Sequence, residues 1–121
     1  PKKPKPLLGF SDITALHLFL NQEWKWPTLH SRNISAMKVG SKKKEDQLLA
    51  RILLGKHQGP VIYKKLIPLN RAATATEIIH SKVTGGNLRI VQSSLRTSWQ
   101  IDPKGKILFL EDVGERGDSL H

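Results

Sequence analysis

The sequence predicts an α/β protein, in which short apolar strands alternate with helices. Residues 7–9 are apolar and follow a proline, and from residue 11 the apolar side chains recur every three or four positions, as they do on one face of a helix. Later in the chain β-branched residues are frequent, and residues 107–110 form a continuous apolar run before two acidic residues. Alternation of this kind is typical of the α/β class.

The first part of the chain predicts a strand, a sharp turn, a helix and a second strand. Residues 7–9 read as the end of a buried strand, and the helix extends from residue 11 to about residue 22. A short extended segment follows at residues 28–30, because Pro27 keeps its predecessor out of the helical region. The apolar positions of the helix are Ile13, Leu16, Phe19 and Leu20.

The clearest helix of the sequence is expected between residues 41 and 55. Ser41 can cap its start and Gly55 supplies a stop, with a further glycine and a proline beyond it. Its apolar stripe consists of Leu48, Leu49, Ile52 and Leu53. A charged helix between punctuated ends is suited to connecting two domains, so we expect it to do so here.

The remaining part of the chain is expected to be richer in strands. Residues 60–69 and 73–83 carry many β-branched side chains, which favour extended structure. Helical spacing returns over residues 88–95, entered from a turn at the glycine pair 85–86, and residues 107–110 predict a strong final strand.

Composition limits the classes of function. The chain contains no cysteine, which excludes disulfides, thiolate catalysis and cysteine zinc sites. Its net charge of +10 raises the question of a nucleic-acid partner. Much of this charge lies in two lysine clusters without interleaved aromatic residues, so we expect solvated surface there rather than nucleic-acid binding. No apolar run approaches the ~20 residues needed to span a bilayer, and we expect a cytoplasmic protein without a membrane partner.

Ser11 has two interpretations. At a strand-to-helix turn, a serine can project above the sheet as a nucleophile, beside helix N–H groups that point into the same space. Ser11 followed by Asp12 is equally ordinary chemistry for capping the first turn of a helix. Nucleophile turns usually have glycine on both sides, and only Gly9 is present, so the local pattern by itself favours the cap.

Glu111 and Asp112 end the final strand, where ligand-facing residues often lie in α/β proteins. A carboxylate there can orient a histidine that activates a serine, although acidic residues are also common at exposed strand ends. None of the five histidines stands out as that base, and no two share a short metal-binding spacing. They are His17, His30, His57, His80 and His121.

The segments "KPLLGFSDITALHLFLN", "PTLHS", "TGGNL" and "GKILFLEDVGE", in this order, resemble the LD-carboxypeptidase family of serine peptidases, which also contains the microcin C immunity proteins. The resemblance implies the end of a flavodoxin-like or glutamine-amidotransferase-like nucleophile domain at residues 1–40. A connecting helix and linker at residues 41–59 and the first part of a β-rich C-terminal domain at residues 60–121 complete the chain. We therefore expect a central fragment, truncated at both ends.

The resemblance also assigns roles to residues. Ser11 matches the nucleophile, the backbone N–H of Asp12 helps to form the oxyanion hole, and Glu111 is the acid of a Ser-His-Glu triad. Gly86 and Asn87 are expected to bind substrate. The triad histidine lies further downstream in the family, beyond the end of this chain, and a glycine-rich loop that completes the oxyanion hole lies upstream. "HSRN" at residues 30–33 departs from the family's His-Gly-Pro.

For function, the resemblance implies hydrolysis of the amide bond to the terminal D-amino acid of murein tetrapeptide, in cell-wall recycling. No cofactor or metal is implied. The partners expected are the peptidoglycan-derived peptide and either a second copy of the chain, as a homodimer, or the missing complementary segments. The chain by itself is expected to be inactive. Three alternatives stay open, namely an immunity-type amidase of the same family, a non-catalytic module and a nucleic-acid-binding basic module.

Overall fold

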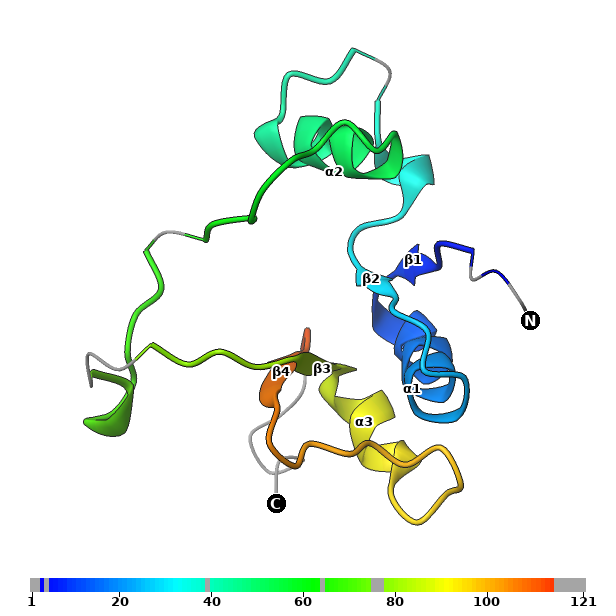
Figure 1. Cartoon of the computed structure of the whole chain (residues 1–121), viewed down its shortest axis with the longest axis vertical. Coiled ribbons are helices and arrows are strands. Elements are labelled where there is room, and N and C mark those ends of the chain that lie inside the picture. Colours follow the sequence, from blue (N-terminus) through cyan, green and yellow to red (C-terminus); the bar gives the residue numbers. More distant parts are fainter. Residues whose placement is uncertain (1–2, 4, 39, 64, 75–77, 115–121) are drawn as a thin grey trace. The chain divides into compact units, whose positions relative to one another are not determined.

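The computed structural model describes residues 3, 5–38, 40–63, 65–74 and 78–114. The chain forms two compact units. Unit 1 comprises Pro1–Met37 and Ser81–His121, and unit 2 comprises Lys38–His80. Unit 1 holds both pairs of strands that the described residues form (Figure 1). No helix among the described residues has the length and apolar character to cross a membrane.

The first half of unit 1 is a parallel strand pair joined by a helix. Strand β1 (Leu8–Gly9) pairs with β2 (Leu29–His30), and the register places Gly9 opposite His30. Between the two strands, a 3-10 helix η1 (Ser11–Ile13) leads directly into helix α1 (Thr14–Glu23). The strand, helix and strand predicted for this part of the sequence are confirmed.

The second half of unit 1 repeats this arrangement. Strand β3 (Val83–Asn87) pairs in parallel with β4 (Ile107–Glu111), and helix α3 (Leu88–Ser94) follows β3 without a break. The predicted final strand is confirmed. The prediction of a turn at the glycine pair 85–86 is wrong, because Gly85 and Gly86 lie within β3. Glycine is needed there for close approach, since a Cβ on Gly85 would lie 1.8 Å from the carbonyl oxygen of Phe109.

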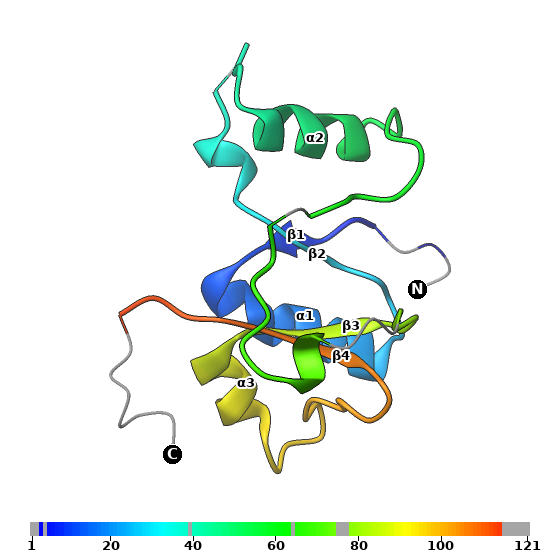
Figure 2. The same cartoon turned by 90° about the vertical axis from the view of Figure 1, so that its left-hand side faces the viewer.

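Helix α1 packs between the two strand pairs of unit 1 (Figure 2). Its first residue, Thr14, is fully buried, and its Oγ1 accepts a hydrogen bond of 2.9 Å from the N–H of Asn87. A Cβ on Gly86 would lie 2.6 Å from the same Oγ1 atom. The backbone of β3 therefore packs directly against the Thr14 side chain of α1. A small apolar core of unit 1 consists of Leu18, Val91 and Ile101, with Trp99 packed against it.

Unit 2 contains helix α2 (Lys44–Leu53) and a short 3-10 helix η3 (Ala72–Thr74). The predicted helix is confirmed, but the expectation that Ser41 caps it is wrong. The residue before the helix is Lys43, with no side-chain cap, and the Ser41 hydroxyl donates instead to the Asp46 carboxylate at 2.6 Å. That carboxylate lies in the first turn of α2, where its negative charge interacts favourably with the positive end of the helix dipole.

The strands predicted at residues 60–69 and 73–83 are wrong for the described residues, apart from Val83 in β3. Residues 60–63, 65–69 and 78–82 form no strand, and their large apolar side chains are exposed. Residues 64 and 75–77 lie outside the described residues. β-branched side chains favour a strand only where a second strand can pair with it, and no partner is present for these segments among the described residues.

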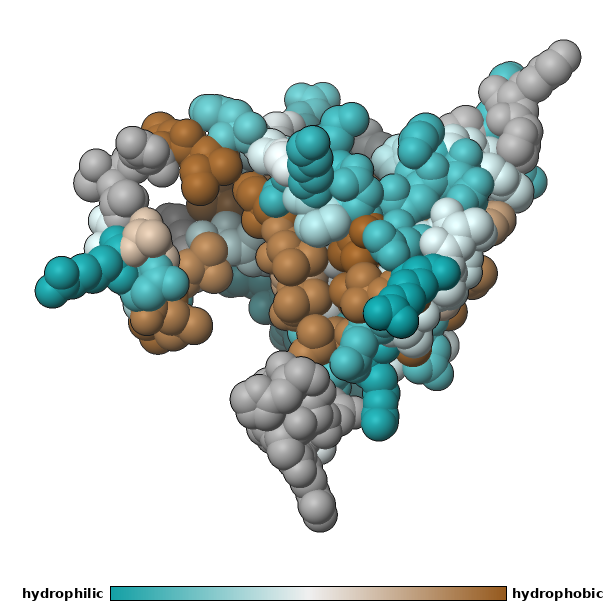
Figure 3. Space-filling model, turned by 90° about the horizontal axis from the view of Figure 1, so that it is seen from below, coloured by the Kyte–Doolittle hydropathy of each residue, from teal (hydrophilic) through white to brown (hydrophobic). Residues whose placement is uncertain are grey.

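Apolar side chains also lie at the surface of β4, where Ile107, Leu108, Phe109 and Leu110 are each between 41 and 47% exposed. A surface view of the chain shows apolar groups gathered among hydrophilic ones (Figure 3). The predicted self-association stays a prediction, as do the domain boundaries at residues 40 and 59 and the flavodoxin-like character of the first domain.

Candidate active site

Ser11 lies at the turn between β1 and α1, in a left-handed backbone conformation with φ of 58°. This conformation costs a residue with a Cβ about 1–2 kcal/mol and concentrates at functional sites. The turn is tight, because a Cβ on Gly9 would lie 2.8 Å from Ile13 Cγ2. A strained serine on a sharp strand-to-helix turn is the geometry of a nucleophile elbow.

The capping interpretation of Ser11 is wrong. The capping residues are Phe10 for η1 and Ile13 for α1, and neither makes a side-chain cap. The Ser11 side chain is exposed and makes no hydrogen bond with the described residues. Asp12 follows it in η1, whose first N–H groups have no carbonyl partner within the helix. The role of the Asp12 N–H in an oxyanion hole stays a prediction.

Glu111 is the last residue of β4, and its carboxylate lies close to the imidazole of His30. Oε1 of Glu111 lies 4.0 Å from Nε2 of His30, and the two side chains are 24% and 28% exposed. That Oε1 atom is buried and has no hydrogen-bond partner among the described residues. The His30 ring also packs edge-on against the ring of Phe109, with centroids 5.1 Å apart. The structure therefore brings His30 to the predicted acid.

His17, from α1, connects this pair to the Ser11 turn. Its Nε2 lies 3.1 Å from the carbonyl oxygen of Gly9, two residues before Ser11, so this nitrogen carries the proton and donates it. Burial lowers the pKa of His17, the bond to Gly9 opposes this shift, and the neighbouring His30 lowers the pKa further. The rings of His17 and His30 lie 5.9 Å apart. A neutral imidazole thus joins the turn to the His30–Glu111 pair.

A second connection between Ser11 and Glu111 is made through β3. Register pairing places Asn87 opposite Glu111, and the Asn87 N–H binds Thr14, the first residue of α1. The Asn87 side chain caps α3 by accepting from Ile90 N at 3.2 Å. Gly86 lies against Thr14. The start of α1 and the end of β4 are therefore held at the same end of unit 1, while substrate binding by Gly86 and Asn87 stays a prediction.

The other titratable candidates fall elsewhere. His57 and His80 belong to unit 2, and His121 lies outside the described residues. Asp112 accepts a 2.7 Å hydrogen bond from Val113 N. Within the described ranges, no three of His, Cys, Asp and Glu gather in a way that could hold a metal ion.

His30 is the residue that sequence reasoning missed. Nothing in its spacing distinguishes it from the other four histidines, because its partner is 81 positions away and is reached only through the pairing of two separate sheets. One signal could have pointed to His30. It ends a predicted strand that could pair with the strand before Ser11, and the carboxyl ends of neighbouring parallel strands lie close together.

The fold and these residues define a protein of the α/β class with a serine at a strand-to-helix turn and a carboxylate at a nearby strand end. Residues 1–31 match the LD-carboxypeptidase N-terminal domain, and residues 80–121 match the LD-carboxypeptidase C-terminal domain. The chain belongs to the LD-carboxypeptidase family, as its "GFSD" and "FLEDVGE" segments predict.

Three curated relatives match nearly the whole of the chain. A protein of Rickettsia conorii, named as a carboxypeptidase, is 52% identical over 117 residues, which cover 93% of this chain and 36% of that protein. A Rickettsia prowazekii protein with the same kind of name is 50% identical, with the same shares covered. A Bacillus subtilis protein named as a murein peptide carboxypeptidase is 33% identical over 94% of this chain and 35% of its own length. The chain thus spans about a third of each relative, and no solved structure matches it.

Proposed function

We propose that this chain carries the nucleophile and the acid of a serine-type LD-carboxypeptidase, which releases the terminal D-amino acid of murein tetrapeptide during cell-wall recycling in the cytoplasm. The observation that supports it best is the left-handed backbone of Ser11 at the turn before α1. The contact of His17 with Gly9 and that of Thr14 with Asn87 hold the residues on either side of Ser11 at the same end of unit 1 as Glu111. The name of the Bacillus subtilis relative supports the substrate class.

In the proposed reaction, Ser11 Oγ attacks the carbonyl carbon of the amide bond, and an imidazole base accepts its proton. The base then returns the proton to the nitrogen of the departing D-amino acid as the C–N bond breaks. Water, activated in the same way, attacks the acyl-serine and restores the Ser11 hydroxyl. The Asp12 N–H stabilises the negative charge on the carbonyl oxygen, and Glu111 orients the imidazole and stabilises its protonated form.

We propose that the base is a histidine outside the 121 residues, and that His30 serves Glu111 rather than Ser11. His30 Nε2 contacts Oε1 of Glu111, which has no other partner among the described residues. If His30 holds Oε1 of Glu111, the other carboxylate oxygen remains available to accept a hydrogen bond from the base. His30 is then a positioning residue, and on this proposal the chain by itself shows no turnover.

The test is a chimera, because the Rickettsia conorii relative supplies a longer protein that is 52% identical to this chain. Its 117 matched residues are replaced by those of this chain, and release of D-alanine from murein tetrapeptide is measured beside the unaltered relative. We expect turnover by the chimera and its loss on Ser11→Ala. An aminoacyl-nucleotide analogue is the second substrate, and turnover of that analogue in place of the tetrapeptide would contradict the proposal in favour of an immunity-type amidase.

A further inference from the structure

Thr14 is buried where the two halves of unit 1 meet. It is the first residue of α1 and directly follows η1, whose three residues begin with Ser11. The Thr14 side chain is 0% exposed, and its Oγ1 accepts a 2.9 Å hydrogen bond from the N–H of Asn87, 73 positions further along the chain. Because Asn87 ends β3, the Thr14 hydroxyl links the start of α1 to the end of that strand.

The two ends of this hydrogen bond lead to the predicted nucleophile and the predicted acid. On one side, η1 connects Thr14 to Ser11 without a break. On the other side, Asn87 is paired in register with Glu111 of β4. A movement of α1 along β3 would therefore change the separation of Ser11 and Glu111. The contact leaves little room for such a movement, since a Cβ on Gly86 would lie only 2.6 Å from Thr14 Oγ1.

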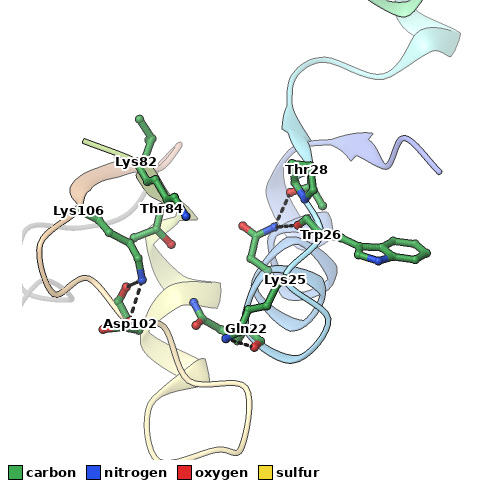
Figure 4. A pocket seen from close by; sticks show the side chains of 11 residues that line it. Gln22, Lys25, Trp26, Thr28, Lys82, Thr84, Asp102 and Lys106 are labelled. Carbon is green, nitrogen blue, oxygen red and sulfur yellow. Dashed lines mark hydrogen bonds and ion pairs between the residues drawn. The ribbon is translucent and has the colours of Figure 1, made fainter. Parts of the chain in front are cut away.

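The opposite end of α1 borders a hollow of about 650 Å³, and the hydrogen bonds drawn around it each stay within one half of unit 1 (Figure 4). Asn21 donates to the carbonyl oxygen of Trp26 at 2.6 Å and to Thr28 Oγ1 at 3.3 Å. Lys106 donates to the Asp102 carboxylate at 2.8 Å. These bonds hold the loop after α1 and the segment before β4 separately, whereas the Thr14 bond crosses from one half to the other.

We propose that Thr14 is a positioning residue for the peptidase reaction, and that its hydroxyl fixes Ser11 relative to Glu111. This proposal rests on the proposed function and adds a residue that acts through Asn87, because Thr14 itself is fully buried. A displacement of about 1 Å between reacting groups can lower a rate about a hundredfold, so a small movement of α1 is enough to slow the reaction. Loss of the bond should therefore lower kcat and leave KM nearly unchanged.

The experiment uses the chimera with the Rickettsia conorii relative and measures kcat and KM for D-alanine release. Thr14→Val keeps the shape of the side chain and removes the acceptor oxygen, and we expect kcat to fall about tenfold or more with KM within about twofold. Thr14→Ser keeps the acceptor oxygen and should retain kcat within about threefold of the unaltered chimera.

Ser94, at the end of α3, is the matched control. It is likewise 0% exposed, and its Oγ accepts a 3.2 Å hydrogen bond from the N–H of Ile101. Ser94→Ala also removes a buried hydroxyl that accepts from a backbone N–H, so it should lower stability but not kcat. If Thr14→Val does not fold, Thr14→Cys replaces it. Sulfur is a weak acceptor, so kcat of Thr14→Cys should then be lower than that of Thr14→Ser.

A fall in kcat with Thr14→Val that is absent in Ser94→Ala and recovered in Thr14→Ser supports the proposal. Equal kcat values for Thr14→Val and Ser94→Ala would overturn it, as would equal values for Thr14→Cys and Thr14→Ser where these are compared. A rise in KM alone would also overturn it, since Thr14 would then act on substrate binding and not on the position of Ser11.

An unaltered chimera without turnover would contradict the proposed function, and the role of Thr14 is then decided on the isotope-labelled 121-residue chain. Thr14→Val should shift the amide resonances of both Ser11 and Glu111, because the lost bond joins their elements. Ser94→Ala should leave both resonances in place. A Glu111 resonance that does not respond to Thr14→Val would show that Thr14 does not fix the two residues relative to each other.

Discussion

Nε2 of His30 lies 4.0 Å from Oε1 of Glu111, although the two residues belong to different strand pairs. The strand that carries His30 pairs with the strand that leads into Ser11, and Glu111 ends the last strand of the same unit. Most of the surface of both side chains is removed from water. This contact therefore joins the two segments that match the family's N- and C-terminal domains.

The His30–Glu111 contact should couple the two residues in stability. We expect a double-mutant cycle with His30→Ala and Glu111→Gln to give a coupling energy of about 0.5–1 kcal/mol, because the pair is partly buried. Urea unfolding measures the free energies of unfolding of the four proteins. Losses that simply add in the double variant would show that the two side chains do not interact.

The left-handed backbone of Ser11 predicts an unusual response to glycine. Ser11→Gly and Ser11→Ala both remove the hydroxyl, but only glycine adopts a φ of 58° without strain. We expect Ser11→Gly to be more stable than Ser11→Ala by about 1 kcal/mol in its free energy of unfolding.

Ser93, in the regular helix α3, is the matched control, because glycine should there be the less stable variant by about 1 kcal/mol. If the two positions respond alike, Ser11 is not strained and the structural basis for a nucleophile turn is lost.

Gly85, in β3, and Gly105, in the turn before β4, should differ sharply in their tolerance of a methyl group. In Gly85→Ala, the new Cβ would lie 1.8 Å from the Phe109 carbonyl oxygen, which is backbone and cannot move without opening the β3–β4 pair. We expect a loss of about 3 kcal/mol or more, or an unfolded chain. Gly105→Ala meets open space at a φ of 67° and should cost about 1 kcal/mol. Thermal unfolding compares them, and equal losses would contradict the described register.

Stability should depend on pH through His17. Its folded-state pKa is lowered, first of all by burial, so the unfolded chain binds the proton more readily. The folded state is therefore favoured above the ordinary histidine value of about 6.5, and it loses stability as the pH falls below that value towards the lowered pKa. His17→Gln keeps an N–H donor for the Gly9 carbonyl but does not titrate.

We expect the free energy of unfolding to fall less in His17→Gln than in the unaltered chain between about pH 8 and about pH 5, because the variant cannot be protonated. The other histidines are common to both proteins and cancel in the comparison. Identical pH profiles would show that His17 is not held neutral in the fold.

The sequence predicted the elements whose pattern is local. The helical spacing after residue 11 correctly predicted α1, and the apolar run at residues 107–110 correctly predicted β4. In both places the periodicity of the apolar side chains matches the element that forms. Residues 60–69 were misjudged for the opposite reason. Their β-branched side chains fit a strand, but a strand needs a partner, and pairing depends on parts of the chain that a local pattern does not contain.

The same limit applies to the candidate site. Ser11 and Glu111 could be proposed from the sequence because they lie in motifs, at a turn and at a strand end, and their catalytic roles stay predictions. The left-handed backbone of Ser11 was not predictable, since the residue type does not favour it and no local pattern requires it. His30 was not predictable as the neighbour of Glu111, because the contact depends on how two strand pairs pack around α1.

The most direct test of the account is whether Ser11 and Glu111 act as one catalytic unit. In the chimera described above, we measure kcat for D-alanine release with Ser11→Ala, Glu111→Gln and the double variant. Each single change should lower kcat by about three to four orders of magnitude, and the double variant should be no slower than Ser11→Ala, because groups of one triad are not additive. Independent, multiplying losses, or a Ser11→Ala chimera that still releases D-alanine at its original rate, would contradict the central claim.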